Sequence, residues 1–167
     1  MELQEKLSDI TCKNVLLVDD EEIDLFIHEK VLTTTGFASQ VHKVQSGRLA
    51  LEYLKSAKTQ ADLPELIFLD LNMPLMNGFD FLTAFERLPK NITEHCKVVI
   101  LTSSSSDGDR SKAMKYNAVM KYIFKPINEV LLTELKKIAD AKRATGDPIA
   151  TIMDNFKKQH QRNPRIN

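Results

Sequence analysis

Three aspartates in this chain stand directly after apolar stretches. Asp19 and Asp20 follow residues 15–18, and Asp70 follows residues 66–69. Short apolar runs that stop at polar residues and turn formers are typical of buried strands. Open α/β sheets bind ligands at the carboxyl ends of their parallel strands, so these carboxylates would meet at that edge. Because three neighbouring negative charges repel one another, the pattern predicts a site for a divalent cation.

The elements that must position these aspartates alternate between strand and helix. The expected strands are residues 14–18, 40–44, 66–70, 98–101 and 122–124. The expected helices are residues 22–35, 47–58, 79–88, 107–116 and 128–142. This alternation predicts an α/β fold, with a parallel sheet, helices on both faces and right-handed crossovers.

The expected helices carry apolar stripes and end signals. In the first, the stripe at steps of three and four residues consists of Ile23, Phe26, Ile27 and Val31. In the helix that Ser46 is expected to cap, the stripe consists of Leu49, Ala50, Tyr53 and Leu54. In the third helix, the residues expected to face inward are Phe81, Leu82 and Phe85. Gly36 is well placed to end the first helix.

The composition excludes several classes of partner. Lysine plus arginine equals aspartate plus glutamate, 23 each, so no electrostatic argument favours nucleic acid or an anionic membrane. Cys12 and Cys96 match neither a metal spacing nor a disulfide framework. The chain has no signal-peptide pattern and no apolar run of about 18 residues that would span a bilayer. We therefore expect a cytoplasmic protein that binds neither nucleic acid nor membrane.

Two further polar features follow expected strands. Thr102 comes after residues 98–101, and Lys125 with Pro126 comes after the strand 122–124. Residues 70–78 follow the pattern D-x-x-M-P-x-M-[DN]-G at every fixed position. In this order, these features resemble the receiver domain of two-component response regulators, as in the bacterial chemotaxis regulator. The resemblance covers residues 13–142 and implies a flavodoxin-like, doubly wound (βα)5 fold with a five-stranded parallel sheet in the order 2-1-3-4-5.

The resemblance also implies a phosphorylation site and its metal ion. Asp70 matches the aspartate that accepts a phosphoryl group from a sensor histidine kinase or a histidine phosphotransfer protein in phosphorelay signal transduction. Asp19 and Asp20 match the acids that hold Mg²⁺ or Mn²⁺, together with Asp70 and the backbone carbonyl of Asn72. The protein would carry an aspartyl phosphate and catalyse at most its own dephosphorylation, so a classical enzyme is not expected.

The remaining matched residues imply a switch. Thr102 matches the hydroxyl that turns toward the phosphoryl group, and Lys125 matches the lysine that pairs with it. Tyr122 matches the aromatic residue that swings inward on activation, and the bond to Pro126 is cis in the family. The output would be altered binding of a downstream protein, and the surface of the last two helices and the last strand is a candidate homodimer contact. Residues 117–121 depart from the family, because they are one residue longer than its usual Gly-Ala turn; Asn117 is expected to tolerate a left-handed turn there.

The expected organisation is an extension at 1–12, a receiver domain at 13–142 and a tail at 143–167. The tail includes a short amphipathic pattern formed by Ile149, Ile152, Met153 and Phe156. Its length leaves no room for a DNA-reading domain, so we expect a stand-alone response regulator.

Two alternative functions are open. One is a haloacid-dehalogenase-type enzyme, although that family needs a second aspartate where this chain has Asn72. The other is a degenerate receiver that binds partners without phosphorylation, against which the intact acidic, threonine and lysine positions argue.

Overall fold

The structure, a computed structural model, describes residues 12–133. Its strands are β1 (Cys12–Val18), β2 (Ala38–Val44), β3 (Leu66–Leu69), β4 (Lys97–Thr102) and β5 (Val119–Phe124). Its helices are α2 (Glu22–Thr34), α3 (Gly47–Ser56), α4 (Gly78–Phe85), α5 (Lys90–Thr93) and α6 (Asp107–Ala113), with a 3-10 turn η1 (Gln60–Asp62). The expected domain boundaries and the tail pattern lie outside the described residues or at their margins, and stay predictions.

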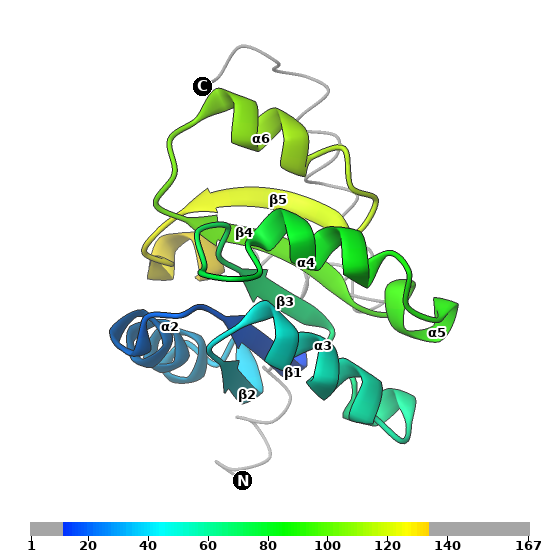
Figure 1. The fold of residues 1–167 in the computed structure, drawn as a ribbon. Helices are drawn as coiled ribbons and strands as arrows, with labels where there is room; N and C mark the ends of the chain where they lie inside the picture. The colour runs from blue at the N-terminus through cyan, green and yellow to red at the C-terminus, as the bar shows by residue number, and fades with distance from the viewer. Residues whose placement is uncertain (1–11, 134–167) are drawn as a thin grey trace, which may run out of the picture.

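The strands form one parallel sheet in the order β2-β1-β3-β4-β5, as Figure 1 shows. The predicted flavodoxin-like α/β fold and strand order are therefore confirmed. Because every strand runs in the same direction, all carboxyl ends lie along one edge of the sheet. The aspartates that follow β1 and β3 are thereby brought together.

Apolar side chains cover both faces of the sheet, as a doubly wound fold requires. One core lies under α3, α4 and α6 and includes Leu54, Phe81 and Phe85. The other lies under α2 and includes Leu25 and Leu32. Figure 1 shows α3 and α4 on one side of the sheet and α2 on the other. Within residues 12–133, no helix is long and apolar enough to cross a membrane.

Of the four residues of the apolar stripe expected on α2, Val31 packs against the core and the other three do not. Ile23, Phe26 and Ile27 are exposed by 71%, 57% and 42%, whereas the buried residues of the helix are Leu25, His28 and Leu32. The helix carries two apolar stripes, and periodicity alone does not distinguish which one meets the core. The stripe with His28 packs on the sheet, and Ile23, Phe26 and Ile27 face solvent.

Other local predictions are confirmed or corrected in detail. The Ser46 hydroxyl caps α3 by accepting a hydrogen bond from the Leu49 N–H, and Gly36 ends α2 with a φ of 68°. Leu49 itself is half exposed, and Leu51 is buried in its place. The structure adds the short helix α5 and ends α6 at Ala113, three residues earlier than expected. Most of the helix expected at 128–142 lies outside the described residues.

The segment expected to be one residue longer than in the family contains a β-bulge at the start of β5. Val98 pairs with Val119, but the next residue, Val99, pairs with Lys121, so Met120 is the added residue. A bulge lets a strand gain one residue without losing the register of the rest. The left-handed turn expected at Asn117 is wrong, since Leu75 is the one residue other than glycine with a positive φ within 12–133.

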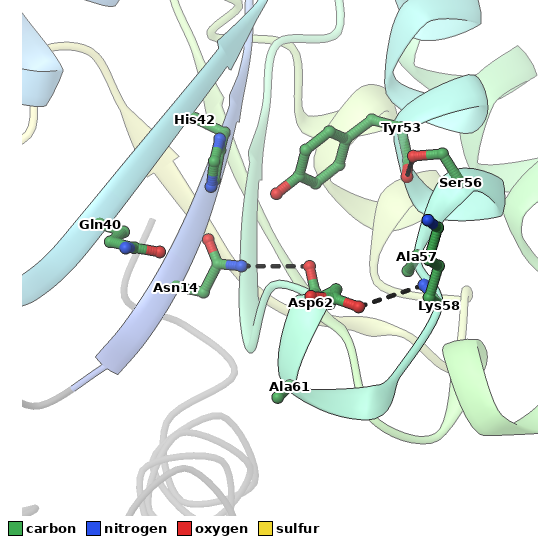
Figure 2. Close-up of a pocket in the computed structure, with 9 residues that line it drawn as sticks. All are labelled: Asn14, Gln40, His42, Tyr53, Ser56, Ala57, Lys58, Ala61 and Asp62. Atoms are coloured by element: carbon green, nitrogen blue, oxygen red, sulfur yellow. Dashed lines mark hydrogen bonds between the residues drawn. The ribbon is translucent and has the colours of Figure 1, made fainter.

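A pocket of about 420 Å³ lies at the opposite, amino-terminal edge of the sheet. Residues of β1, β2, η1 and the end of α3 line it, as Figure 2 shows. Asn14 on β1 is buried against it, five residues before Asp19. Five residues of extended strand span about 16 Å, so this pocket is separate from the acidic edge.

Candidate functional site

The three predicted aspartates meet at the carboxyl edge of the sheet. Carboxylate oxygens of Asp19, Asp20 and Asp70 all lie within 4.8 Å of one another. Asp19 and Asp70 are buried, and Asp20 is half-buried. The strands fix this meeting point, because Val18 pairs with Leu69 and the Asp70 N–H donates to the Val18 carbonyl at 3.0 Å. The acidic cluster predicted from the sequence is therefore present.

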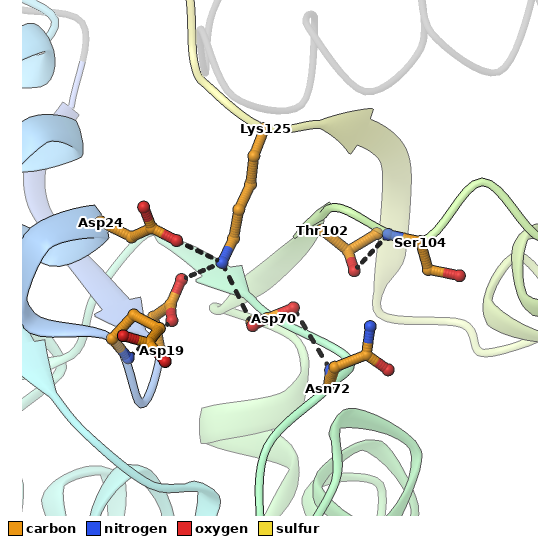
Figure 3. A network of polar contacts seen from close by, with 8 residues as sticks. Asp19, Asp24, Asp70, Asn72, Thr102, Ser104 and Lys125 are labelled. Atoms are coloured by element: carbon orange, nitrogen blue, oxygen red, sulfur yellow. Dashed lines mark hydrogen bonds and ion pairs between the residues drawn. The ribbon is translucent and has the colours of Figure 1, made fainter.

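Lys125 reaches into this cluster from the end of β5 (Figure 3). Its Nζ lies 2.6 Å from Asp19 Oδ2, 2.7 Å from Asp24 Oδ2 and 3.2 Å from Asp70 Oδ2. The Lys125 N–H donates to the Thr102 carbonyl at 2.9 Å, which fixes the start of the side chain beside β4. The Lys125–Pro126 peptide bond is cis, as the resemblance implies.

Burial and neighbouring charges shift the pKa values of Asp70 and Lys125. Burial raises the pKa of Asp70, and the neighbouring Asp19 raises it further, while Lys125 opposes both. Burial alone would lower the pKa of Lys125, but hydrogen bonds to Asp19 and Asp24 hold it above its ordinary value. The lysine therefore stays charged, and it is the main cation facing the aspartates.

The turn after β3 brings its backbone close to Asp70. The Asn72 N–H donates to Asp70 Oδ1 at 3.3 Å, and the Gly78 N–H donates to the Leu71 carbonyl at 2.9 Å. A Cβ atom on Gly78 would lie 2.7 Å from Leu71 Cα and 2.8 Å from the Asp70 carbonyl oxygen. Only glycine leaves room for this approach, so the motif's last residue keeps the turn packed against the site.

Thr102 and Tyr122 are joined through Ser104. Thr102 is fully buried, and its Oγ1 accepts a hydrogen bond from the Ser104 N–H at 3.2 Å. The Tyr122 hydroxyl donates to the Ser104 carbonyl at 3.0 Å. The backbone N–H and carbonyl of Ser104 therefore connect Thr102 of β4 with Tyr122 of β5.

The Tyr122 ring is buried against neighbours on α6 and β5. The Arg110 guanidinium lies 5.5 Å from the ring centroid, and the Phe124 ring packs edge-on at 5.8 Å. Burial raises the pKa of Tyr122, so the hydroxyl is a hydrogen-bond donor at neutral pH. Tyr122 thus links the acidic edge to the surface of α6 and β5.

Asp24 is a site residue that the sequence reading missed. It lies in the first turn of α2 and shares Lys125 with Asp19 and Asp70. An acidic residue in a first helical turn is usually explained by the helix dipole, which gives no hint of a distant partner. Its position five residues after Asp19 is the only signal that could have placed it near the same edge.

The donor set suits a hard divalent cation. Asp19, Asp20, Asp24 and Asp70 bring four negative charges, which Lys125 offsets by one. Mg²⁺ and Mn²⁺ take carboxylate oxygens and waters in octahedral geometry, and three carboxylates within 4.8 Å fit that need. Soft ligands are absent from the cluster of described residues, which disfavours Zn²⁺ and Cu⁺.

Comparison with known proteins identifies the family. Residues 15–137 match the response regulator receiver domain, so the chain belongs to that family. Receiver domains are signalling modules of two-component systems, and they bind Mg²⁺ at an acidic pocket. They interact with histidine kinases or phosphotransfer proteins and with downstream targets.

Individual relatives agree with this assignment. The chain is 30% identical over 115 residues to the probable methanogenesis regulatory protein FilR2 of Methanothrix harundinacea, covering 68% of this chain and 72% of that protein. It is 26% identical over 148 residues to hybrid signal transduction histidine kinase I of Dictyostelium discoideum, covering 86% of this chain but 8% of that protein. A response regulator receiver protein from Dyadobacter fermentans superposes with a TM-score of 0.67 at 30% identity, covering 75% of this chain and 95% of that one.

Proposed function

We propose that this chain is a phosphorylation-dependent switch that accepts a phosphoryl group on Asp70. The observation that carries the proposal is the position of this carboxylate: buried at the sheet edge, beside two more aspartates and 3.2 Å from the Lys125 ammonium. Phosphoryl transfer asks a protein chiefly for positioning and for charge neutralisation, and this arrangement offers both.

The chemistry needs one bond exchange. An Asp70 oxygen attacks phosphorus, a P–O bond forms as the P–N bond to the donor's histidine breaks, and the released imidazole nitrogen takes up a proton. Lys125 then pairs with a phosphoryl oxygen as a compact cation. The Thr102 hydroxyl, which accepts the Ser104 N–H, still has its own hydrogen to donate to another phosphoryl oxygen.

Asp19, Asp20, Asp70 and the Asn72 carbonyl would hold the Mg²⁺ or Mn²⁺ ion. When bound, the ion supplies charge that offsets repulsion between the carboxylates and the incoming phosphate. Millimolar Mg²⁺ should raise the melting temperature of the wild type, since a ligand that binds only the folded state stabilises it. Asp20→Ala should lose most of this increase.

The donor protein would dock on the exposed stripe of α2. Ile23 lies four residues after Asp19 and next to Asp24, so this stripe begins beside the acidic edge. A donor that docks there would bring its histidine toward Asp70. Covering exposed apolar side chains with a partner removes them from water, which lowers the free energy of the complex. A helical donor with an apolar face beside its histidine fits this surface.

The test is labelling by acetyl phosphate with Mg²⁺, followed by intact-protein mass spectrometry. The wild type should gain one phosphoryl group, which alkaline hydrolysis removes as expected for an acyl phosphate. Asp70→Asn should gain none, because the amide nitrogen leaves no nucleophilic carboxylate. Asp107→Asn, an exposed aspartate at the start of α6, is the matched control and should label normally.

Normal labelling of Asp70→Asn would overturn the assignment. Loss of labelling in both variants would mean that overall charge, and not this carboxylate, controls the reaction. The cognate kinase, the downstream protein, a homodimer, stand-alone action and a cytoplasmic location stay predictions from the sequence.

A further inference from the structure

Asp24 contacts the lysine of the site but does not belong to its metal-binding cluster. Its Oδ2 lies 2.7 Å from the Lys125 Nζ. Among residues 12–133, the carboxylates that could hold one cation together are those of Asp19, Asp20 and Asp70. The described ion pairs therefore join Asp24 to the site through the lysine, and its part in the chemistry depends on what the lysine does.

The Lys125 ammonium lies closer to the far side of the site than to Asp70. The sheet order places β3, which Asp70 follows, between β1 and β5. Lys125 follows β5, yet its Nζ is nearest to Asp19, which follows β1, and to Asp24 on α2. Asp70 Oδ2, at the end of the intervening strand, is 3.2 Å away (Figure 3). Asp19 and Asp24 thus hold the ammonium beyond the carboxylate that would react.

The ammonium has no N–H left for a new partner. A lysine has three N–H donors, and three carboxylates surround this one. A phosphoryl oxygen on Asp70 can pair with Lys125 only if one of these contacts is given up. Phosphorylation therefore requires an exchange of partners at the lysine.

Exposure decides which contact is exchanged. The side chains of Asp19 and Asp70 are each 6% exposed, whereas that of Asp24 is 33% exposed. A buried carboxylate that loses its cation costs much more free energy than one that water can solvate. The contact of Lys125 with Asp24 is therefore the one that a phosphoryl group replaces at the lowest cost.

The charge of Asp24 is balanced by Lys125 alone in the described part of the chain. His28 lies one turn further along α2 and is buried there. Burial lowers the pKa of His28, so its imidazole is neutral at pH 7 and adds no second positive charge. Lys125 is the cation that pairs with Asp24 within residues 12–133. A substitution that removes the charge of Asp24 should thus act mainly on the lysine.

We propose that Asp24 is a positioning residue that restrains phosphorylation of Asp70. It holds the Lys125 ammonium in the unphosphorylated protein and releases it to the phosphoryl group. The inference rests on the proposed function, because it concerns a phosphoryl group on Asp70. Without the charge of Asp24, the ammonium is left to Asp19 and Asp70, closer to the group that reacts. Phosphorylation should then be faster.

The test measures the rate at which acetyl phosphate labels Asp70 at saturating Mg²⁺. Asp24→Asn should react about threefold faster or more, the size expected when a partly exposed ion pair is lost. Asp24→Glu keeps the charge and should react at the wild-type rate. Glu22→Gln removes an exposed charge from the same helical turn and should also leave the rate unchanged.

Two outcomes of this experiment would overturn the inference. One is an Asp24→Asn rate equal to or below that of a wild type that is itself labelled, and this result leaves the proposed function intact. The other is equal acceleration in Glu22→Gln, which would show that net charge and not the contact with Lys125 controls the rate. The comparison of Asp24→Asn with Asp24→Glu needs no substitution of the lysine, so it decides even where Lys125→Met does not fold.

A double-mutant cycle tests whether Asp24 acts through Lys125. In the Lys125→Met background, Asp24→Asn should not accelerate labelling, and an acceleration that persists would overturn this route. Urea unfolding without Mg²⁺ gives a readout that does not depend on phosphorylation. Asp24→Asn should raise the urea midpoint more in Lys125→Met than in the protein that keeps Lys125, because the carboxylates there repel one another without a cation. Equal changes in both backgrounds would show that the two side chains do not interact and would overturn the inference.

Discussion

Lys125 lies closer to Asp19 than to Asp70, although all three side chains share the site. Its Nζ is 2.6 Å from Asp19 Oδ2 and 3.2 Å from Asp70 Oδ2. The lysine is thus held mainly by Asp19 and Asp24, with Asp70 at a longer distance. A phosphoryl group on Asp70 would add negative charge on that side and attract the ammonium toward it.

Replacing Lys125 by methionine tests how much its charge stabilises the buried carboxylates. The variant leaves buried carboxylates without a cation, a change that costs about 3–5 kcal/mol in comparable buried pairs. Urea unfolding without Mg²⁺ measures the loss, and millimolar Mg²⁺ should restore part of it by neutralising the same carboxylates.

Lys43→Met is the matched control for Lys125→Met. Lys43 pairs with Glu29 at the surface, where an ion pair is worth about 0–1 kcal/mol. If both variants lose the same stability, or if Mg²⁺ stabilises them equally, the special role of Lys125 is wrong.

Asp70→Asn should stabilise the protein at neutral pH. Burial raises the pKa of Asp70 above its ordinary 3.8, so the ionised form costs stability in the fold. This cost is absent below the unfolded pKa and grows as pH rises through the higher folded pKa. The melting temperature of the variant should therefore exceed that of the wild type at pH 7, and the difference should shrink toward about pH 4.

Mg²⁺ gives the control for this pH effect. Because the ion would neutralise the Asp70 carboxylate, its addition at pH 7 should reduce the advantage of Asp70→Asn. An advantage that is independent of pH would show that ionisation of Asp70 is not its cause.

Gly78→Ala should disturb the site through its backbone. The added Cβ would meet Leu71 Cα at 2.7 Å, and overpacking of this kind costs about 1–3 kcal/mol. Labelling of Asp70 should slow as well, because the Asp70 carbonyl lies 2.8 Å from the same Cβ.

Gly108→Ala provides the comparison for that substitution. Its Cβ would meet nothing closer than Ser106 Oγ at 3.5 Å, and alanine suits a helix better than glycine by roughly 0.5–1 kcal/mol. This variant should be neutral or more stable, and its labelling should be unchanged. Equal losses in both variants would contradict the close-approach argument.

The sheet and the acidic edge could be predicted because their signals are local. Apolar runs that end in aspartates define both the strands and the positions of Asp19, Asp20 and Asp70. The family pattern added Thr102 and Lys125 at the ends of neighbouring strands, and Tyr122 within β5. Parallel pairing then brings together residues that lie far apart in the sequence.

Features that depend on tertiary packing and strand pairing could not be predicted from the sequence. α2 offers two apolar stripes, and only packing against β1 and β2 decides between Leu25 with Leu32 and Ile23 with Phe26. The partnership of Asp24 with Lys125 spans 101 residues and has no local sequence signal. The bulge at Met120 depends on how β5 pairs with β4, which the length of the loop alone does not fix.

Thr102→Ala should separate phosphorylation from the response on α6 and β5. The variant removes the hydroxyl that accepts the Ser104 N–H, and Ser104 in turn accepts from Tyr122. Labelling of Asp70 should persist, while amide shifts of residues 107–133 on phosphorylation should fall to a small fraction of the wild-type values. Thr33→Ala, which removes a hydroxyl that donates to carbonyls of its own helix α2, should keep the full response. An undiminished response in Thr102→Ala would exclude this route.

The exposed stripe of α2 should matter to a protein donor and not to a small one. Ile23→Ser combined with Phe26→Ser removes apolar side chains that are 71% and 57% exposed. The free energy of unfolding should therefore change by about 0.5 kcal/mol or less per site. Acetyl phosphate needs no docking surface, and its rate should be unchanged. Transfer from the protein donor that labels the wild type fastest should fall at least tenfold.

Leu49→Ser tests whether that loss is specific to α2. Leu49 is an apolar residue of α3 that is 39% exposed, and it lies outside the proposed docking stripe. Transfer from the protein donor should be unchanged in this variant. If Leu49→Ser slows transfer as much as the α2 substitutions do, general surface hydrophobicity explains the effect. If neither change slows it, the donor must approach Asp70 across another surface, such as the loop that carries the exposed Leu75.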